Sequence, residues 1–178
     1  MLVLLLYAAL GAQAAGKITA VSAPAAIQSK EASKGMSFSE NESLKTGEKG
    51  HLRAQLNDGS TLSLGNMSAV RIVRVDDRTE QAIIELSYGQ VRVNVTARHL
   101  PDSYVLILTN LGTIDIRSSA DVLVDSSSPI ETTVMVSGAA EKVTAKSTDP
   151  NHPVPMQLTP GRWRISMDSQ PIRMIDPN

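Results

Sequence analysis

Hydrophobic and polar residues alternate along the segment 52–64, and the apolar residues hold the even positions on both sides of Asp58-Gly59. Directly opposed residues of an antiparallel pair share one face of a sheet. A two-residue turn would put the two apolar rows on opposite faces. A three-residue loop, Asn57–Gly59 with Gly59 left-handed, instead pairs Ala54 with Leu62. The pattern therefore predicts a hairpin with this longer loop, in which Asp58 and Ser60 bond to the backbone of their own turn.

A second alternating segment, 84–95, changes parity, because its apolar residues move from even to odd positions at Gly89. Such a switch is typical of a hairpin whose loop has an even number of residues. Gly89-Gln90 fits a type II′ turn, which requires positive φ at its first central residue. The sequence predicts a second hairpin that pairs Leu86 with Val93.

Short alternating or apolar segments continue along the chain, with Gly, Asp or Pro between them. The slip in alternation at 70–75 predicts a β-bulge. The consecutive apolar residues of 104–108 predict a central strand covered on both faces. One short helix is expected at 39–45, and a last hairpin at 159–162. The prediction is an all-β fold, either a β-sandwich or a twisted β-solenoid-like stack of short antiparallel hairpins.

Trp163, the single tryptophan, stands between two arginines. An indole beside guanidinium groups can act as a recognition anchor. Alternation, however, puts Trp163 and Ile165 on one face and Arg162 and Arg164 on the other. This favours a core position for the indole.

The N-terminus carries an apolar run, Leu2 to Ala12, followed by the small-x-small pattern Ala12-Gln13-Ala14. This is typical of a secretory signal cleaved after Ala14 or Ala15, and it is too short for a membrane helix of ~20 apolar residues. We expect a signal peptide at 1–15, one β-domain at 16–167 and a tail at 168–178. The mature chain should have no stable membrane span and should be periplasmic, secreted or part of the cell envelope.

Charge and composition exclude several functional classes. The formal net charge is −1, with 17 basic and 18 acidic side chains that are mixed along the chain, so there is no basic stripe for nucleic acid. Cysteine is absent, which leaves the fold without internal disulfides. Aromatic residues make up 3% of the chain, too few for a carbohydrate-binding module built on stacking platforms.

Candidate chemistry is sparse. His51, His99 and His152 are far apart and lack the spacing of metal ligands. Asp76 and Asp77 are adjacent acids that would need burial and a raised pKa to act as a catalytic pair. We expect no catalytic residue, no metal site and no cofactor, and hence no enzyme.

The two alternating segments together resemble the core signature of the FecR domain family, an Asp-Gly-Ser turn between strands followed by Leu-x-x-Gly-x-Val-x-Val. The matching segments are 58–64 and 86–93, with weaker matches at 44–47, 133–138 and 158–161. The resemblance implies structural roles for nine residues: Asp58, Gly59, Ser60, Leu62, Leu64, Leu86, Gly89, Val91 and Val93.

In function, the resemblance implies a periplasmic sensory domain that relays contact with an outer-membrane receptor to a sigma factor. No cytosolic anti-sigma segment or receptor-docking domain is recognised in this sequence. We therefore expect a stand-alone exported module that binds another envelope protein through strand edges or loops. Such a module can be linked to cell-surface signalling. The alternatives are an envelope hydrolase that uses Asp76, Asp77 or His51, and a purely structural envelope protein.

Overall fold

The computed structural model describes residues 13–96, 98–138, 141–167 and 169–174. These residues form seventeen strands in one hydrogen-bonded network and no helix, so the all-β prediction is confirmed. No helix in the described ranges could cross a membrane. Residues 1–12 of the expected signal peptide lie outside the described residues.

The strands form two layers. Sheet A contains, in spatial order, β4 (Ser37–Ser39), β1 (Ala14–Ser22), β6 (His51–Leu56), β7 (Thr61–Leu64), the second half of β9 (Gln81–Val95), β12 (Ala120–Ser126), β13 (Glu131–Ser137), β16 (Gly161–Ser166) and β17 (Ser169–Met174). Sheet B contains β3 (Lys30–Glu31), β2 (Ala25–Ile27), β5 (Ser43–Thr46), β8 (Ser68–Asp76), the first half of β9, β10 (Tyr104–Leu108), β11 (Gly112–Ile116), β14 (Val143–Ser147) and β15 (Met156–Gln157).

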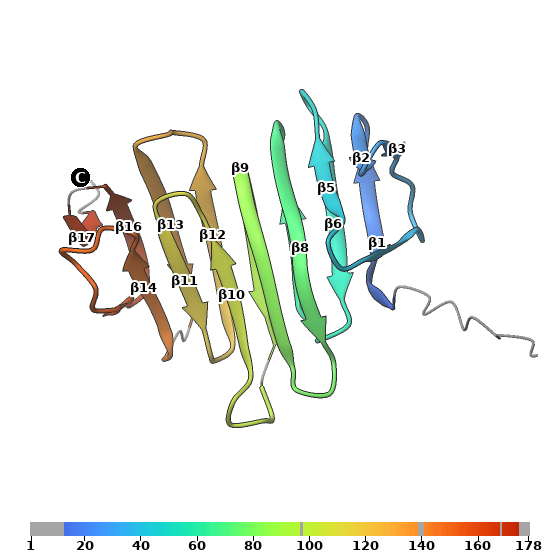
Figure 1. The fold of residues 1–178 in the computed structure, drawn as a ribbon. Helices are drawn as coiled ribbons and strands as arrows, with labels where there is room; N and C mark the ends of the chain where they lie inside the picture. Colours follow the sequence, from blue (N-terminus) through green and yellow to red (C-terminus); the bar gives the residue numbers. More distant parts are fainter. Residues whose placement is uncertain (1–12, 97, 139–140, 168, 175–178) are drawn as a thin grey trace, which may run out of the picture.

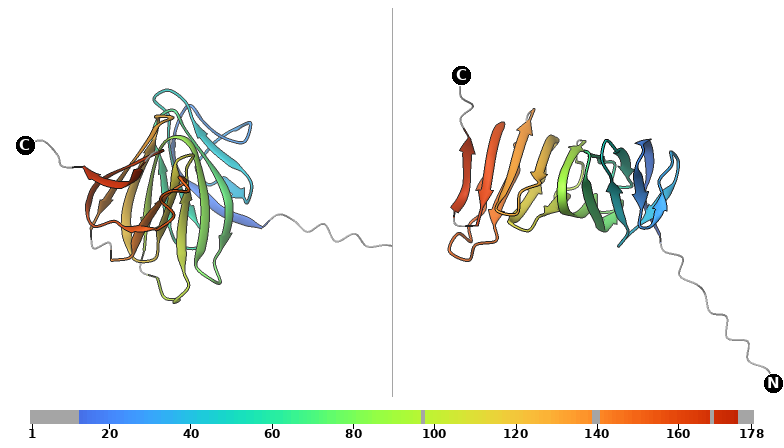
Figure 2. Two further views of the ribbon diagram at one scale, coloured as in Figure 1. Left: turned by 60° about the vertical axis from the view of Figure 1, so that its left-hand side comes forward. Right: turned by 90° about the horizontal axis from the view of Figure 1, so that it is seen from above.

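The chain crosses repeatedly between the sheets, and each passage adds strands next to those of the passage before. The colours in Figure 1 therefore run in sequence order from β1 and β2 at one end to β16 and β17 at the other. The same order is visible from above in Figure 2. The molecule is thus a two-sheet sandwich whose strands are stacked in sequence order, as in a solenoid. It combines the two predicted architectures.

One continuous core lies between the sheets. Sheet A contributes inward side chains such as Leu62 and Val93, and sheet B contributes others such as Ile84 and Ile107, all of them fully buried. Alternation along each strand places every second residue in this core, because successive side chains of a strand point to opposite faces. Burial of aliphatic surface is the main stabilising contribution in a chain without cysteine.

The first predicted hairpin is confirmed. β6 and β7 pair Ala54 with Leu62 and Leu52 with Leu64, and the amide of Leu56 donates to the carbonyl of Ser60 at 2.9 Å across the three-residue loop. The predicted bulge in β8 is also confirmed, since the register with β9 shifts between Ile72 and Arg74.

The second predicted hairpin is wrong. Residues 81–95 form one strand, β9, which passes through Gly89 without reversing. Leu86 pairs with Val70 in sheet B, and Val93 pairs with Leu62 and Val122 in sheet A. The parity switch marks the point where the strand leaves one sheet for the sheet that faces it.

Four smaller expectations differ from the structure. In place of the predicted helix at 39–45, residues 40–42 form the turn between β4 and β5, and residues 43–45 belong to β5; the Ser39 amide donates to the Glu42 carboxylate across this turn. β10 is central, between β9 and β11, but only one of its faces is fully buried. The turn at 159–162 joins sheet B to sheet A and does not close a hairpin. Residues 169–174, which belong to the expected tail, form β17.

Candidate functional site

The Asp58-Gly59-Ser60 turn carries a buried polar cluster. The Asp58 carboxylate accepts hydrogen bonds from the Ser60 amide at 3.0 Å and from the Ser60 hydroxyl at 2.8 Å. Gly59 adopts φ of 89°, the left-handed conformation expected for this loop. Both polar side chains therefore stabilise the turn, as Asp and Ser commonly do.

Arg98 lies against this turn and completes the cluster. Its Nη2 donates to Asp58 Oδ2 at 2.8 Å and to Ser60 Oγ at 2.9 Å, and its Nη1 donates to the carbonyls of Asp58 and Glu80. The exposed fractions of the Arg98 and Asp58 side chains are 4% and 0%. This buried ion pair fixes the segment after β9 to the β6–β7 turn.

The sequence analysis did not identify Arg98. It is 40 positions from Asp58 and belongs to none of the motifs. The available signal was indirect, because a carboxylate in a turn that covers a core requires a cationic or hydrogen-bonding partner.

Gly89, the other glycine of the signature, lies where β9 passes over the start of β8. Its φ is 83°, and a Cβ at this position would lie 2.5 Å from the Met67 carbonyl oxygen and 2.6 Å from the Ser68 Cα. The next amide, of Gln90, donates to Ser68 Oγ at 2.8 Å. Only glycine allows this approach of the two backbones.

The five aliphatic residues of the signature, Leu62, Leu64, Leu86, Val91 and Val93, are all within the core and at most 2% exposed. Together with the buried turn, they leave no side chain of the signature free to contact a ligand. The signature residues build the fold, and a functional surface must lie elsewhere.

The residues considered for catalysis are not brought together. His51 lines one hollow with Arg53, whereas Asp76 and Asp77 line another with Arg74 and Glu40. Desolvation opposes ionisation of Asp76, but hydrogen bonds from Arg78, Thr79 and Arg74 together hold its pKa below the usual value, the opposite of what a general acid needs. Within the described residues, no three His, Cys, Asp or Glu side chains are grouped to hold a metal ion.

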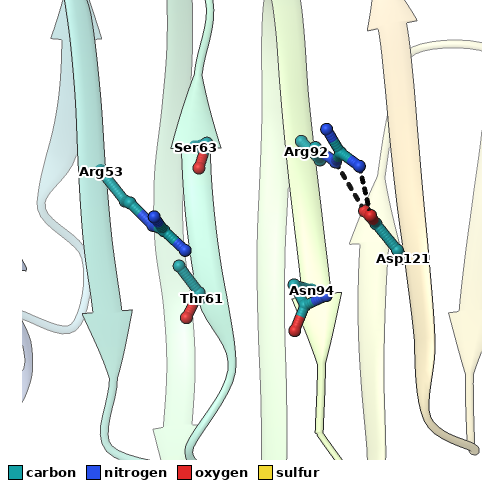
Figure 3. Close-up of a pocket in the computed structure, with 6 residues that line it drawn as sticks. All are labelled: Arg53, Thr61, Ser63, Arg92, Asn94 and Asp121. Carbon is teal, nitrogen blue, oxygen red and sulfur yellow. Dashed lines mark hydrogen bonds and ion pairs between the residues drawn. The ribbon is translucent and has the colours of Figure 1, made fainter.

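The strongest candidate site is a polar hollow of about 270 Å³ on the outer face of sheet A (Figure 3). It is lined by Arg53 of β6, Thr61 and Ser63 of β7, Arg92 and Asn94 of β9, and Asp121 of β12. Strand register brings them together, because Ser63 is opposite both Arg53 and Arg92, and Asn94 is opposite both Thr61 and Asp121. The floor of the hollow is therefore a pair of polar cross-strand rows.

The two arginines of this hollow differ in electrostatic environment. Arg92 forms a bidentate ion pair with Asp121, whose hydrogen bonds and negative charge raise the pKa of the guanidinium. Arg53 forms no ion pair with another described residue, and in Figure 3 its side chain extends from β6 toward Thr61. Arg53 is thus available to bind an anionic group.

Arg53 also lines two adjoining hollows, of about 350 and 320 Å³, which extend toward β1. Together the three hollows form a shallow region of the outer face with hydroxyls, two side-chain amides and guanidinium groups. They contain no Ser or Thr hydroxyl hydrogen-bonded to a histidine or a free carboxylate among the described residues, as nucleophilic catalysis would require. The arrangement is suited to binding a polar, anionic surface.

Comparisons with known proteins give the fold and, separately, the family of this chain. Two crystal structures of a protein described as a "putative anti-sigma factor" from Parabacteroides distasonis ATCC 8503 match with a TM-score of 0.60, at 14% and 15% identity. Each match covers 74% of this chain and 58% of that one, so this chain spans little more than half of its structural neighbour. A search of curated proteins finds no match. The family model described as "FecR protein" matches residues 42–141, more than half of the chain, and the chain therefore belongs to the FecR protein family.

Proposed function

We propose that this protein is a non-catalytic sensory or signalling module of the bacterial envelope that acts by binding another protein. The observation that carries this proposal is the FecR match over 42–141, which covers β5 through β13, the middle of the stack. The fold shared with a protein described as a "putative anti-sigma factor" supports a signalling role. The Arg53 hollows supply a polar surface for a partner, and the signature residues are buried beneath it.

Export is the second part of the proposal, and it is supported by the apolar run from Leu2 to Ala12 and by the small-x-small pattern Ala12-Gln13-Ala14. Within this proposal, a contact of β1 favours cleavage after Ala14. Ala15 is 1% exposed, and its carbonyl accepts a hydrogen bond from the Asn57 amide at 2.9 Å. Cleavage after Ala14 keeps this contact in the mature protein, whereas cleavage after Ala15 removes it.

The experiment for this function is a crosslinking pull-down of the exported protein from its own bacterium, with cell fractionation and sequencing of the mature N-terminus. A specific envelope protein recovered with a periplasmic bait supports the proposal. Retention in the cytoplasm with residues 1–14 attached contradicts the export step. Recovery of no specific partner favours a purely structural envelope protein instead.

A further inference from the structure

A single row of opposed residues crosses most of the outer face of sheet A. Each member is opposite the next in the strand register, from β6 through β7, β9, β12, β13 and β16 to β17. We call this row the cross-strand band. Its members are Arg53, Ser63, Arg92, Leu123, Met135, Arg162 and Met174.

In the cross-strand band, Arg53 and Arg162 lie on either side of an apolar pair, Leu123 and Met135. Ser63 and the ion-paired Arg92 separate this pair from Arg53, and Met174 follows Arg162. Arg53 and Arg162 are exposed, and neither forms an ion pair with another described residue. Leu123 and Met135 lie between them, and Met135 is 40% exposed. Ile172, in the next row beside Arg164, extends the apolar surface and is 44% exposed. Exposed apolar groups bordered by charge are typical of protein interaction surfaces.

The carboxylates near the cross-strand band are already engaged. Asp121 forms an ion pair with Arg92, and Glu131 Oε2 lies 3.9 Å from Arg164 Nη1. Burial opposes ionisation of Asp125, but hydrogen bonds from Ser127 and Gln90 and the charge of Arg162 hold its pKa below the usual value. Asp125 therefore compensates part of the charge of Arg162, and the guanidinium of Arg53 has no such carboxylate among these three.

The outer face of sheet B differs in this respect. Arg71 pairs with Glu85 at its centre, and Arg117 pairs with Asp115 and lies over the Tyr104 ring at 5.7 Å. Arg74 of the same sheet pairs with Asp76. The arginines of sheet B form ion pairs within the chain, whereas Arg53 and Arg162 of the band form none with a described residue. The band thus carries exposed guanidinium groups that an acidic partner can bind.

We propose that the cross-strand band binds an amphipathic, acidic segment of a protein partner, which lies across the strands with carboxylates at both ends and apolar side chains between. This inference rests on the proposed function and names the partner chemistry. Arg53 and Arg162 are five strand spacings apart, or ~24 Å at ~4.8 Å per spacing. A helix of ~16 residues spans that distance at ~1.5 Å per residue.

Two other occupants fit the band less well. A second copy of this chain would bring like charges together, because both bands carry Arg53 and Arg162, and such contacts oppose association. A neutral glycan would find no aromatic platform, since no member of the band is aromatic. An acidic protein segment satisfies both the charge and the apolar centre.

The test is photo-crosslinking in the native bacterium with the full-length chain. Met135→p-benzoylphenylalanine places the probe in the band, and Leu106→p-benzoylphenylalanine places it on the outer face of sheet B. We expect capture of a protein from position 135 only. Mass spectrometry should map the captured segment to one with acidic residues on both sides of an apolar centre.

Charge reversal completes the design. R53E/R162E should lower the crosslink yield at position 135 by about tenfold or more, since both ends then repel the partner. The matched control K45E/K146E changes the same charge on the outer face of sheet B and should leave the yield unchanged. If circular dichroism shows that R53E/R162E is not folded, R53Q/R162Q replaces it, with an expected loss of several-fold.

The outcomes separate this inference from the proposed function. The band is overturned, and the proposed function left intact, by either of two results. One is that the partner recovered by pull-down crosslinks equally from position 106, and the other is that the R53E/R162E variant still crosslinks to it at full yield. Crosslinking of the chain to itself, or to a segment without acidic residues, also overturns the band. Binding to anionic vesicles or polysaccharide with no protein crosslink overturns both.

Discussion

The two signature glycines have nearly the same backbone conformation and different structural roles. Gly59 has φ of 89° and closes a hairpin inside sheet A, and Gly89 has φ of 83° and lies where β9 passes from sheet B to sheet A. A Cβ on Gly59 would have only Thr96 Oγ1 nearby, at 3.5 Å, whereas a Cβ on Gly89 would overlap the backbone of β8. The hairpin depends on its side chains, and the crossing depends on the absence of one.

This difference explains why the apolar pattern gave one correct register and one wrong one. In a sandwich, the inward directions of the two sheets are opposite. A strand that runs from one sheet into the other must therefore turn its other face inward, which switches the parity of its buried residues. A two-residue hairpin produces the same switch. The pattern around Gly89 is thus common to both structures.

The largest expected effect is at the hairpin, in the ion pair beneath its turn. Arg98→Met should lower the free energy of unfolding by about 3–5 kcal/mol, because it leaves the Asp58 carboxylate buried without its cation. Urea unfolding followed by circular dichroism measures this. In the double variant D58N/R98M, no buried charge remains, and the loss should be smaller than the sum of the two single losses. Additive losses would show that the pair is not coupled.

At the crossing, Gly89→Ala should lower the free energy of unfolding by about 2–4 kcal/mol, through left-handed strain and overlap with the backbone of β8. The same urea titration measures it. Ser68→Ala removes the hydroxyl that binds the Gln90 amide and gives more room, but it should not rescue Gly89→Ala, because backbone atoms of Met67 and Ser68 remain. Full rescue would show that the Ser68 side chain, and not the backbone of Met67 and Ser68, obstructs the added Cβ.

Gly59→Ala should have a smaller effect, about 1 kcal/mol, because only the left-handed φ is strained and the space around the Cβ is open. Gly138→Ala is the matched control, with φ of 80° and no atom within 4 Å of the added Cβ. The two losses should agree closely. A loss at Gly59 as large as at Gly89 would remove the distinction between the two sites.

The smallest effect is expected for the exposed ion pairs of the outer faces. Arg92→Ala and Arg71→Ala should each change the free energy of unfolding by less than about 1 kcal/mol, because solvent screens both pairs. Differential scanning calorimetry of the two variants checks this. A loss comparable to that of Arg98→Met would show that these surface pairs are structural.

The sequence therefore predicted contacts between strands that are close in sequence better than contacts between strands that are far apart in it. The register of Ala54 with Leu62, the bulge after Ile72 and the core position of Trp163, which is 8% exposed, follow from local alternation. The pairing of Arg98 with Asp58 and the row from Arg53 to Met174 depend on strands far apart in sequence. No local pattern encodes these, because they arise only when successive passages of the chain stack.

Disulfide trapping tests the path of β9 most directly, because the natural chain has no cysteine. A continuous β9 places Ser63 opposite Arg92, so S63C/R92C should oxidise readily to an intramolecular disulfide in the folded protein. Ser87 and Arg92 would be opposite each other only in a hairpin at Gly89-Gln90. Along a continuous strand they are ~16 Å apart, beyond disulfide reach. S63C/R92C should therefore form the bond and S87C/R92C should not, and the reverse result would contradict a strand that passes from one sheet to the other.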